Sequence, residues 1–95
     1  MTYDKVLIEV LPAARAIIAK KMISSGMNQK DIAEKLRITQ PAVSQYKRDT
    51  RGHAAIFDEK PELREAIEKI AEKVANGELN IDDATGEIID LCRNV

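Results

Sequence analysis

Polar side chains that can bond to nucleic-acid bases share one face of a short helix predicted from Gln40 to Arg48. Counted at about 100° per residue, Val43 and Tyr46 lie on the opposite, apolar face. A glutamine can pair with adenine through two hydrogen bonds, and a serine can bond to several base edges in the DNA major groove. A plain helical hairpin would also have a solvated polar face. We expect Pro41, Ser44 and Gln45 on this face, together with Gln40 at the start of the helix, to contact bases.

A second short helix is predicted just before this one. Ile32, Ala33 and Leu36 have the spacing of one helix face, and Ile38 follows as an apolar residue in the connecting turn. Ala33 is small at a place where two helices must approach each other closely. Two short helices, a tight turn and a polar second helix together predict a helix-turn-helix.

Both helices of this segment have sequence signals for their first residues. Asn28 is a suitable N-cap for the first helix, and Asp31 follows three residues later, near the positive end of the helix. Thr39 is the corresponding cap of the second helix. Pro41 then falls in the first turn, where its missing N–H costs no hydrogen bond within the helix.

The segment also resembles the lambda-repressor-like (Xre-type) helix-turn-helix family. The apolar positions of that motif are filled here by Ile32, Ala33, Leu36, Ile38, Val43 and Tyr46, and the stretch TQPAVSQY is similar to predicted archaeal transcriptional regulators of the class. The similarity extends from LPAARAIIA to Arg51 and Gly52, about half of the chain. Arg37 stands where the family usually has glycine. The resemblance therefore implies a positive φ at Arg37, with a strain of order 1 kcal/mol.

The resemblance implies further that the segment after the second helix runs beside the DNA backbone. Lys47, Arg48 and Arg51 are close together there, and we expect at least two of them to contact phosphate, the alternative being a solvated loop. A glutamine at the head of the first motif helix often contacts phosphate in the family, which adds Gln29. Thr39 completes the predicted backbone contacts.

The charge of the chain is divided between its two halves. Residues 1–56 contain ten Lys and Arg against five Asp and Glu, a net of +5, whereas residues 57–95 contain five against eleven, a net of −6. Phosphate attraction acts over about one Debye length, so the basic half matters more than the overall charge of −1. We assign 1–56 to a helix-turn-helix DNA-binding region and 57–95 to an acidic helical pair within one compact domain.

The flanking segments are also predicted to be helical. Lys5 to Val10 is too short for periodicity to separate strand from helix, and we favour helix. Pro12 fits the first turn of a longer helix that ends near Gly26. The apolar segment Ala54 to Phe57 is expected to pack back on the bundle, and Pro61 opens the clearest amphipathic helix of the chain.

The last predicted helix begins after Asn80, with Asp83 at its third position. Its apolar stripe either packs on the helix that starts at Pro61 or forms a twofold interface with a second copy. We favour a homodimer, because regulators of this type commonly read paired half-sites roughly 34 to 36 Å apart. The residues expected at the dimer interface are Ile81, Ala84, Ile88 and Leu91.

Length and composition predict an all-α fold, a small bundle of five to six helices containing the helix-turn-helix. The 95 residues suffice for one domain, and aromatic residues make up only 3% of them, so the core must be aliphatic. A single cysteine, Cys92, excludes an internal disulfide and agrees with a cytoplasmic protein. The apolar runs are too short to cross a membrane.

Enzyme function is not expected. No nucleophile has a base at a recognisable spacing, and there is no glycine-rich phosphate loop. No cofactor or metal site is predicted either, because His53 has no second ligand at a suitable spacing and one thiol cannot hold a metal or an iron-sulfur cluster. Cys92 is expected to be a small buried residue. The sequence does not indicate a small-molecule effector.

These observations predict a transcriptional regulator that binds double-stranded DNA sequence-specifically; we favour a repressor, and the alternative of an activator stays open. The operator and the regulated genes are not predicted, and an antitoxin-like repressor of its own operon belongs to the same class. The alternative is a helical module that uses the outer face of the motif to bind another protein. The positive charge of residues 1–56 favours DNA.

Overall fold

The structure, a computed structural model, describes residues 3–48 and 54–94, and all regular structure in these residues is helical. The order along the chain is α1 (Tyr3–Ser24), α2 (Gln29–Leu36), α3 (Gln40–Arg48), α4 (Ile56–Glu59), α5 (Pro61–Ala75) and α6 (Ile81–Arg93). The prediction of a small all-α bundle is confirmed.

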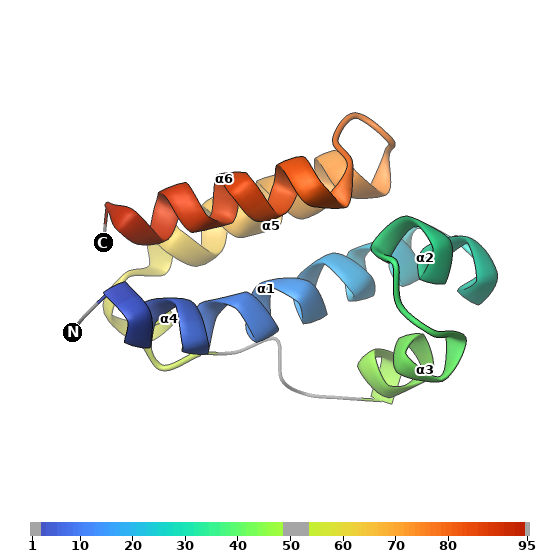
Figure 1. Cartoon of the computed structure of the whole chain (residues 1–95), viewed down its shortest axis with the longest axis horizontal. Coiled ribbons are helices and arrows are strands. Elements are labelled where there is room, and N and C mark those ends of the chain that lie inside the picture. The colour runs from blue at the N-terminus through green and yellow to red at the C-terminus, as the bar shows by residue number, and fades with distance from the viewer. Residues whose placement is uncertain (1–2, 49–53, 95) are drawn as a thin grey trace.

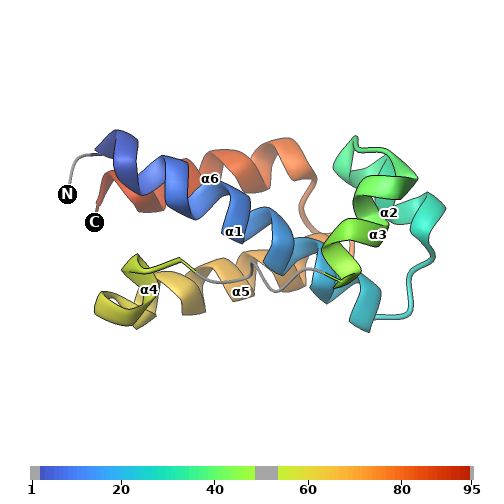
Figure 2. The same ribbon diagram turned by 90° about the horizontal axis from the view of Figure 1, so that it is seen from below.

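Helix α1 is the central element, because every other helix packs against it. At about 1.5 Å per residue its 22 residues extend roughly 33 Å, nearly the 37 Å longest dimension of the molecule. Helices α5 and α6 lie along it as an antiparallel pair, while α2 and α3 gather at its C-terminal end (Figures 1 and 2). The start of α1 and the end of α6 lie at the other end of the molecule.

The prediction that Pro12 lies in the first turn of a helix is wrong. The helix favoured for Lys5 to Val10 is present, but it continues without a break through Pro12 to Ser24. Burial of Val10 and Ala14, on either side of the proline, keeps the segment helical. Pro12 itself is exposed, and it can leave only the carbonyl of Ile8 without a helical donor. Because the Ile8 side chain is 73% exposed, water can reach that part of the helix.

One aliphatic core joins the helices. Its largest fully buried side chains come from α1, α2, α3, α5 and α6, and they are Val10, Ile18, Met22, Ile32, Val43, Ile67 and Cys92. The segment from Ala54 packs back as expected, since Ala54, Ile56 and Phe57 are buried. The boundary predicted between residues 56 and 57 falls inside α4, so the basic and acidic regions share a single core.

The two C-terminal helices have the predicted first residues. Pro61 opens α5, and Leu63, Ile67, Ile70, Ala71 and Val74 are its buried residues. Asn80 caps α6 through its side-chain oxygen, which accepts a hydrogen bond of 2.8 Å from the backbone N–H of Asp83. Gly77, at φ 83°, allows the turn between the two helices.

The apolar stripe of α6 is covered largely by the chain itself. Ala84 and Ile88, which we expected at a dimer interface, are 0% and 2% exposed in the single chain. Their position matches the alternative of intramolecular packing. Ile81 and Leu91 are half-buried, so they are the members of the predicted set that a second copy can still contact.

Among the described residues, no helix combines the length and the apolar character needed to cross a lipid bilayer.

Candidate nucleic-acid interface

The caps predicted for α2 and α3 are present. The side-chain oxygen of Asn28 accepts a hydrogen bond of 2.8 Å from the backbone N–H of Asp31. The hydroxyl oxygen of Thr39 accepts one of 3.2 Å from the backbone N–H of Ala42. Pro41 is the second residue of α3, as the cap at Thr39 requires. These local bonds fix where each helix begins, and so fix the length of the turn between them.

Arg37 has the positive φ that the family resemblance implied. Its backbone angles are φ 57° and ψ 44°, and it is the non-glycine residue with positive φ among those described. The backbone N–H of Ile38 donates to the carbonyl of Ala33 at 3.0 Å, and the N–H of Arg37 donates to that of Glu34 at 3.3 Å. This pattern is a Schellman motif with arginine in the place where glycine is usual. The motif turns the chain sharply from α2 into α3.

The inner face of α3 is held by the core. Val43 is 0% exposed and Ile32 of α2 is also 0% exposed, whereas Tyr46 is half-buried. Helix α3 packs against both α2 and α1. A helix of only nine residues is marginal on its own, so this packing supplies most of its stability.

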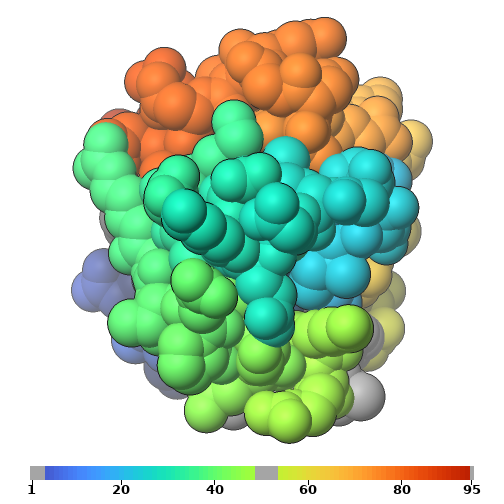
Figure 3. Space-filling view, turned by 90° about the vertical axis from the view of Figure 1, so that its right-hand side faces the viewer, coloured from blue at the N-terminus to red at the C-terminus, as the bar shows by residue number. Residues whose placement is uncertain are grey.

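The outer face of α3 is open to solvent. Of the residues predicted to contact bases, Gln40, Pro41 and Gln45 are exposed, and so are the predicted phosphate contacts Lys47 and Arg48. Helices α2 and α3 together cover most of the end of the molecule drawn in Figure 3, with the turn between α5 and α6 along one edge. The outer face of α3 is therefore accessible from the first residue of the helix to the last.

Two predicted contacts are brought together by a hydrogen bond. The side-chain amide of Gln29, at the start of α2, donates to the hydroxyl of Ser44 on α3. Ser44 is half-buried and Gln29 is exposed. The serine hydroxyl still has its own proton to donate, and the glutamine still has its carbonyl oxygen as an acceptor. The two side chains therefore form one polar unit between the helix predicted to contact phosphate and the helix predicted to contact bases.

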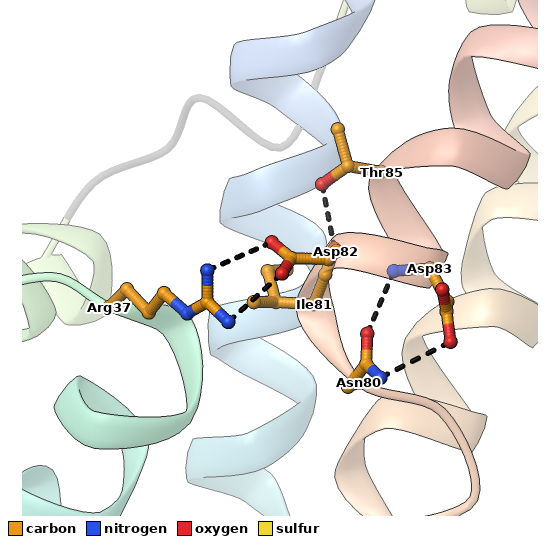
Figure 4. A network of polar contacts seen from close by, with 6 residues as sticks. All are labelled: Arg37, Asn80, Ile81, Asp82, Asp83 and Thr85. Atoms are coloured by element: carbon orange, nitrogen blue, oxygen red, sulfur yellow. Dashed lines mark hydrogen bonds and ion pairs between the residues drawn. The ribbon is translucent and has the colours of Figure 1, made fainter.

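An ion pair not predicted from the sequence connects the turn to α6. The guanidinium of Arg37 makes two contacts with the carboxylate of Asp82, Nη2 to Oδ2 at 2.9 Å and Nη1 to Oδ1 at 3.3 Å (Figure 4). In the same view, Asn80 and Asp83 form the cap of α6 beside it. Part of the acidic half thus lies next to the motif, where Arg37 offsets the charge of Asp82. The two residues are 45 apart in the chain, so no local pattern relates them.

Three residues named in the sequence analysis, Arg51, Gly52 and His53, lie outside the described part of the chain. Cys92 is buried as expected, 2% exposed, and burial raises the pKa of its thiol. Within residues 3–48 and 54–94, no three His, Cys, Asp or Glu side chains are grouped so that they could hold a metal ion.

Comparisons with protein-family models, with curated proteins and with solved structures found no match to this chain. The assignment of a function therefore depends on the geometry and chemistry of the chain itself.

Proposed function

We propose that the protein binds double-stranded DNA sequence-specifically and regulates transcription, with α3 entering the major groove. The observation that supports this most directly is the two-sided character of α3. Val43 fixes its back in the core, while Pro41, Gln45 and Arg48 are exposed on the opposite side. An exposed polar helix after a sharp turn is the arrangement with which helix-turn-helix proteins read base edges.

Each polar group on this surface has a distinct role in the proposal. Gln40 and Gln45 pair with base edges, and the unit formed by Gln29 and Ser44 bridges from phosphate to base. Lys47 and Arg48 neutralise phosphates beside the last turn of α3. The resemblance to the Xre-type motif supports the same division of roles. In this proposal the protein is a repressor that binds paired half-sites as a homodimer.

Selection of bound sequences from random duplex DNA tests the proposal. We expect a consensus containing two related half-sites about one helical turn apart, because one α3 covers only a few base pairs. Recovery of a single half-site would support base reading and contradict the dimer. Failure to enrich any sequence would contradict sequence-specific binding.

A second measurement separates DNA binding from protein binding. Fluorescence anisotropy with a labelled random duplex is recorded at about 50 and 200 mM salt, and we expect binding at the lower value with a steep loss at the higher one. A protein that binds no duplex at low salt would instead be an interaction module, the alternative drawn from the sequence.

A further inference from the structure

A cavity lies beside the motif, between α1, the turn from α2 to α3, and the start of α6. Its volume is about 370 Å³, within the range of roughly 300 to 1,000 Å³ typical of small-molecule sites. Its apolar lining comes from Leu36, Ile38 and Ile81, all half-buried. Tyr46 of α3 and Thr85 of α6 also line it. The cavity therefore offers an apolar surface large enough for a small organic molecule.

The charged residues of the lining favour an anion. They are Arg15, Arg37 and Asp82, two positive charges and one negative, which leave a net of +1. Arg37 is paired with Asp82 (Figure 4). The Arg15 guanidinium has no ion-pair or hydrogen-bond partner among the described residues. Arg15 can therefore bind a carboxylate through two parallel hydrogen bonds without breaking an existing contact.

We infer that this cavity binds a small amphipathic carboxylate, with its carboxylate on Arg15 and its apolar body against Ile38 and Ile81. A cation would be repelled by the net positive charge of the lining, because Asp82, the one acidic residue among its described residues, is already paired. A neutral apolar molecule would leave the Arg15 guanidinium unused. The site goes beyond the proposed DNA binding, and it is tested in the absence of DNA.

The test uses two carboxylates and their uncharged counterparts. Hexanoate, 3-phenylpropanoate, hexanamide and 3-phenylpropanamide are each titrated into the ¹⁵N-labelled full chain, and amide chemical shifts are followed. We expect saturable shifts at Ile38, Ile81 and Thr85 with the two carboxylates, at a Kd of roughly millimolar or tighter. The two amides should bind about tenfold more weakly, since they lack the charge-assisted bond.

Three variants assign the binding to Arg15. Arg15→Gln should weaken the binding of both carboxylates about tenfold and that of the amides little. Arg15→Lys, which keeps the charge, should retain most of the carboxylate affinity. Lys30→Gln removes one positive charge from the exposed surface of α2, outside the cavity, and should leave binding unchanged. Far-UV circular dichroism checks that each variant is folded.

Either of two results would overturn the inference. The first is a titration without saturable shifts at the cavity residues. The second is an affinity that is the same for carboxylate and amide, or the same with and without Arg15. DNA binding could fail in its own experiments while this titration succeeds, so the two proposals are judged separately.

Discussion

At the scale of single residues, Arg37 combines an unfavourable backbone with a favourable side-chain contact. Its φ of 57° is one that glycine adopts without strain, but glycine could not pair with Asp82. Both partners are largely exposed, with side chains 72% and 64% accessible, so the ion pair contributes at most about 1 kcal/mol. The strain and the ion pair are therefore similar in size.

Two substitutions at Arg37 separate these effects. Arg37→Gly and Arg37→Ala both remove the ion pair, but only glycine relieves the left-handed strain. We expect the glycine variant to be more stable than the alanine variant by about 1 kcal/mol in urea denaturation. Equal stabilities would mean that the turn is not held at a positive φ in solution.

In the proposed complex with DNA, Gln45 is an exposed residue of α3 that pairs with a base. Gln45→Ala should weaken binding to the selected duplex by about 1 to 3 kcal/mol and leave binding to random duplex nearly unchanged. Lys47→Ala is the comparison, because loss of its predicted phosphate contact should weaken binding to both duplexes. Anisotropy titrations measure both affinities. An equal loss on the two duplexes for Gln45→Ala would exclude base reading by this side chain.

At the scale of helices, the sequence predicts what depends on a few neighbouring residues. The caps at Asn28, Thr39 and Asn80 are all present, because each bond spans only three residues. The positive φ of Arg37 was implied by the family resemblance and is also present. Of the predicted site, the exposure of Pro41 and Gln45 follows from helical periodicity around Val43.

The features that the sequence did not predict depend on distant residues. The local sequence around Pro12 predicts the start of a helix. The burial of α1 residues on both sides of Pro12 instead keeps the helix continuous there. The contact from Arg37 to Asp82 and the cavity beside it form only after α6 packs next to the motif. The hydrogen bond from Gln29 to Ser44 requires the angle between α2 and α3, which no single segment specifies.

The interior proline of α1 allows a test of stability. A proline inside a helix destabilises the folded protein by about 3 kcal/mol or more. It also restricts the unfolded chain, which stabilises the folded protein by about 0.4 to 1 kcal/mol. Because Pro12 is exposed, we expect Pro12→Ala to raise the free energy of unfolding by about 2 kcal/mol in urea denaturation. Glu9→Ala, at an exposed position of the same helix, should change it by less than about 0.5 kcal/mol. A destabilised Pro12→Ala variant would contradict this account.

At the scale of the whole molecule, opposite charges are distributed over one shared core. Residues 1–56 carry a net of +5 and residues 57–95 a net of −6, yet α1 packs against α5 and α6 as well as α2 and α3. The positive side chains Lys47 and Arg48 are on α3, at one end of the molecule, while α5 and α6 extend away from that end. Local charge, and not net charge, should therefore govern DNA affinity.

The salt dependence of DNA binding tests this distribution. Arg48→Gln should reduce the slope of log K against log salt by about 0.9 for random duplex, the value for one lost phosphate contact. Lys60→Gln removes the same charge next to the start of α5, at the opposite end of the molecule, and should leave the slope unchanged. Equal effects of the two substitutions would show that the total charge of the chain, and not its location, controls binding.

The central position of α1 also determines whether α2 and α3 can fold in the absence of α5 and α6. A fragment that stops before α5 would expose to water the side of α1 that α5 and α6 now cover. Helices α2 and α3 would then pack on an α1 that has lost its contacts with α5 and α6. We therefore expect that α2 and α3 do not fold stably without α5 and α6, so the proposed interface depends on the acidic C-terminal helices as well as on its own residues.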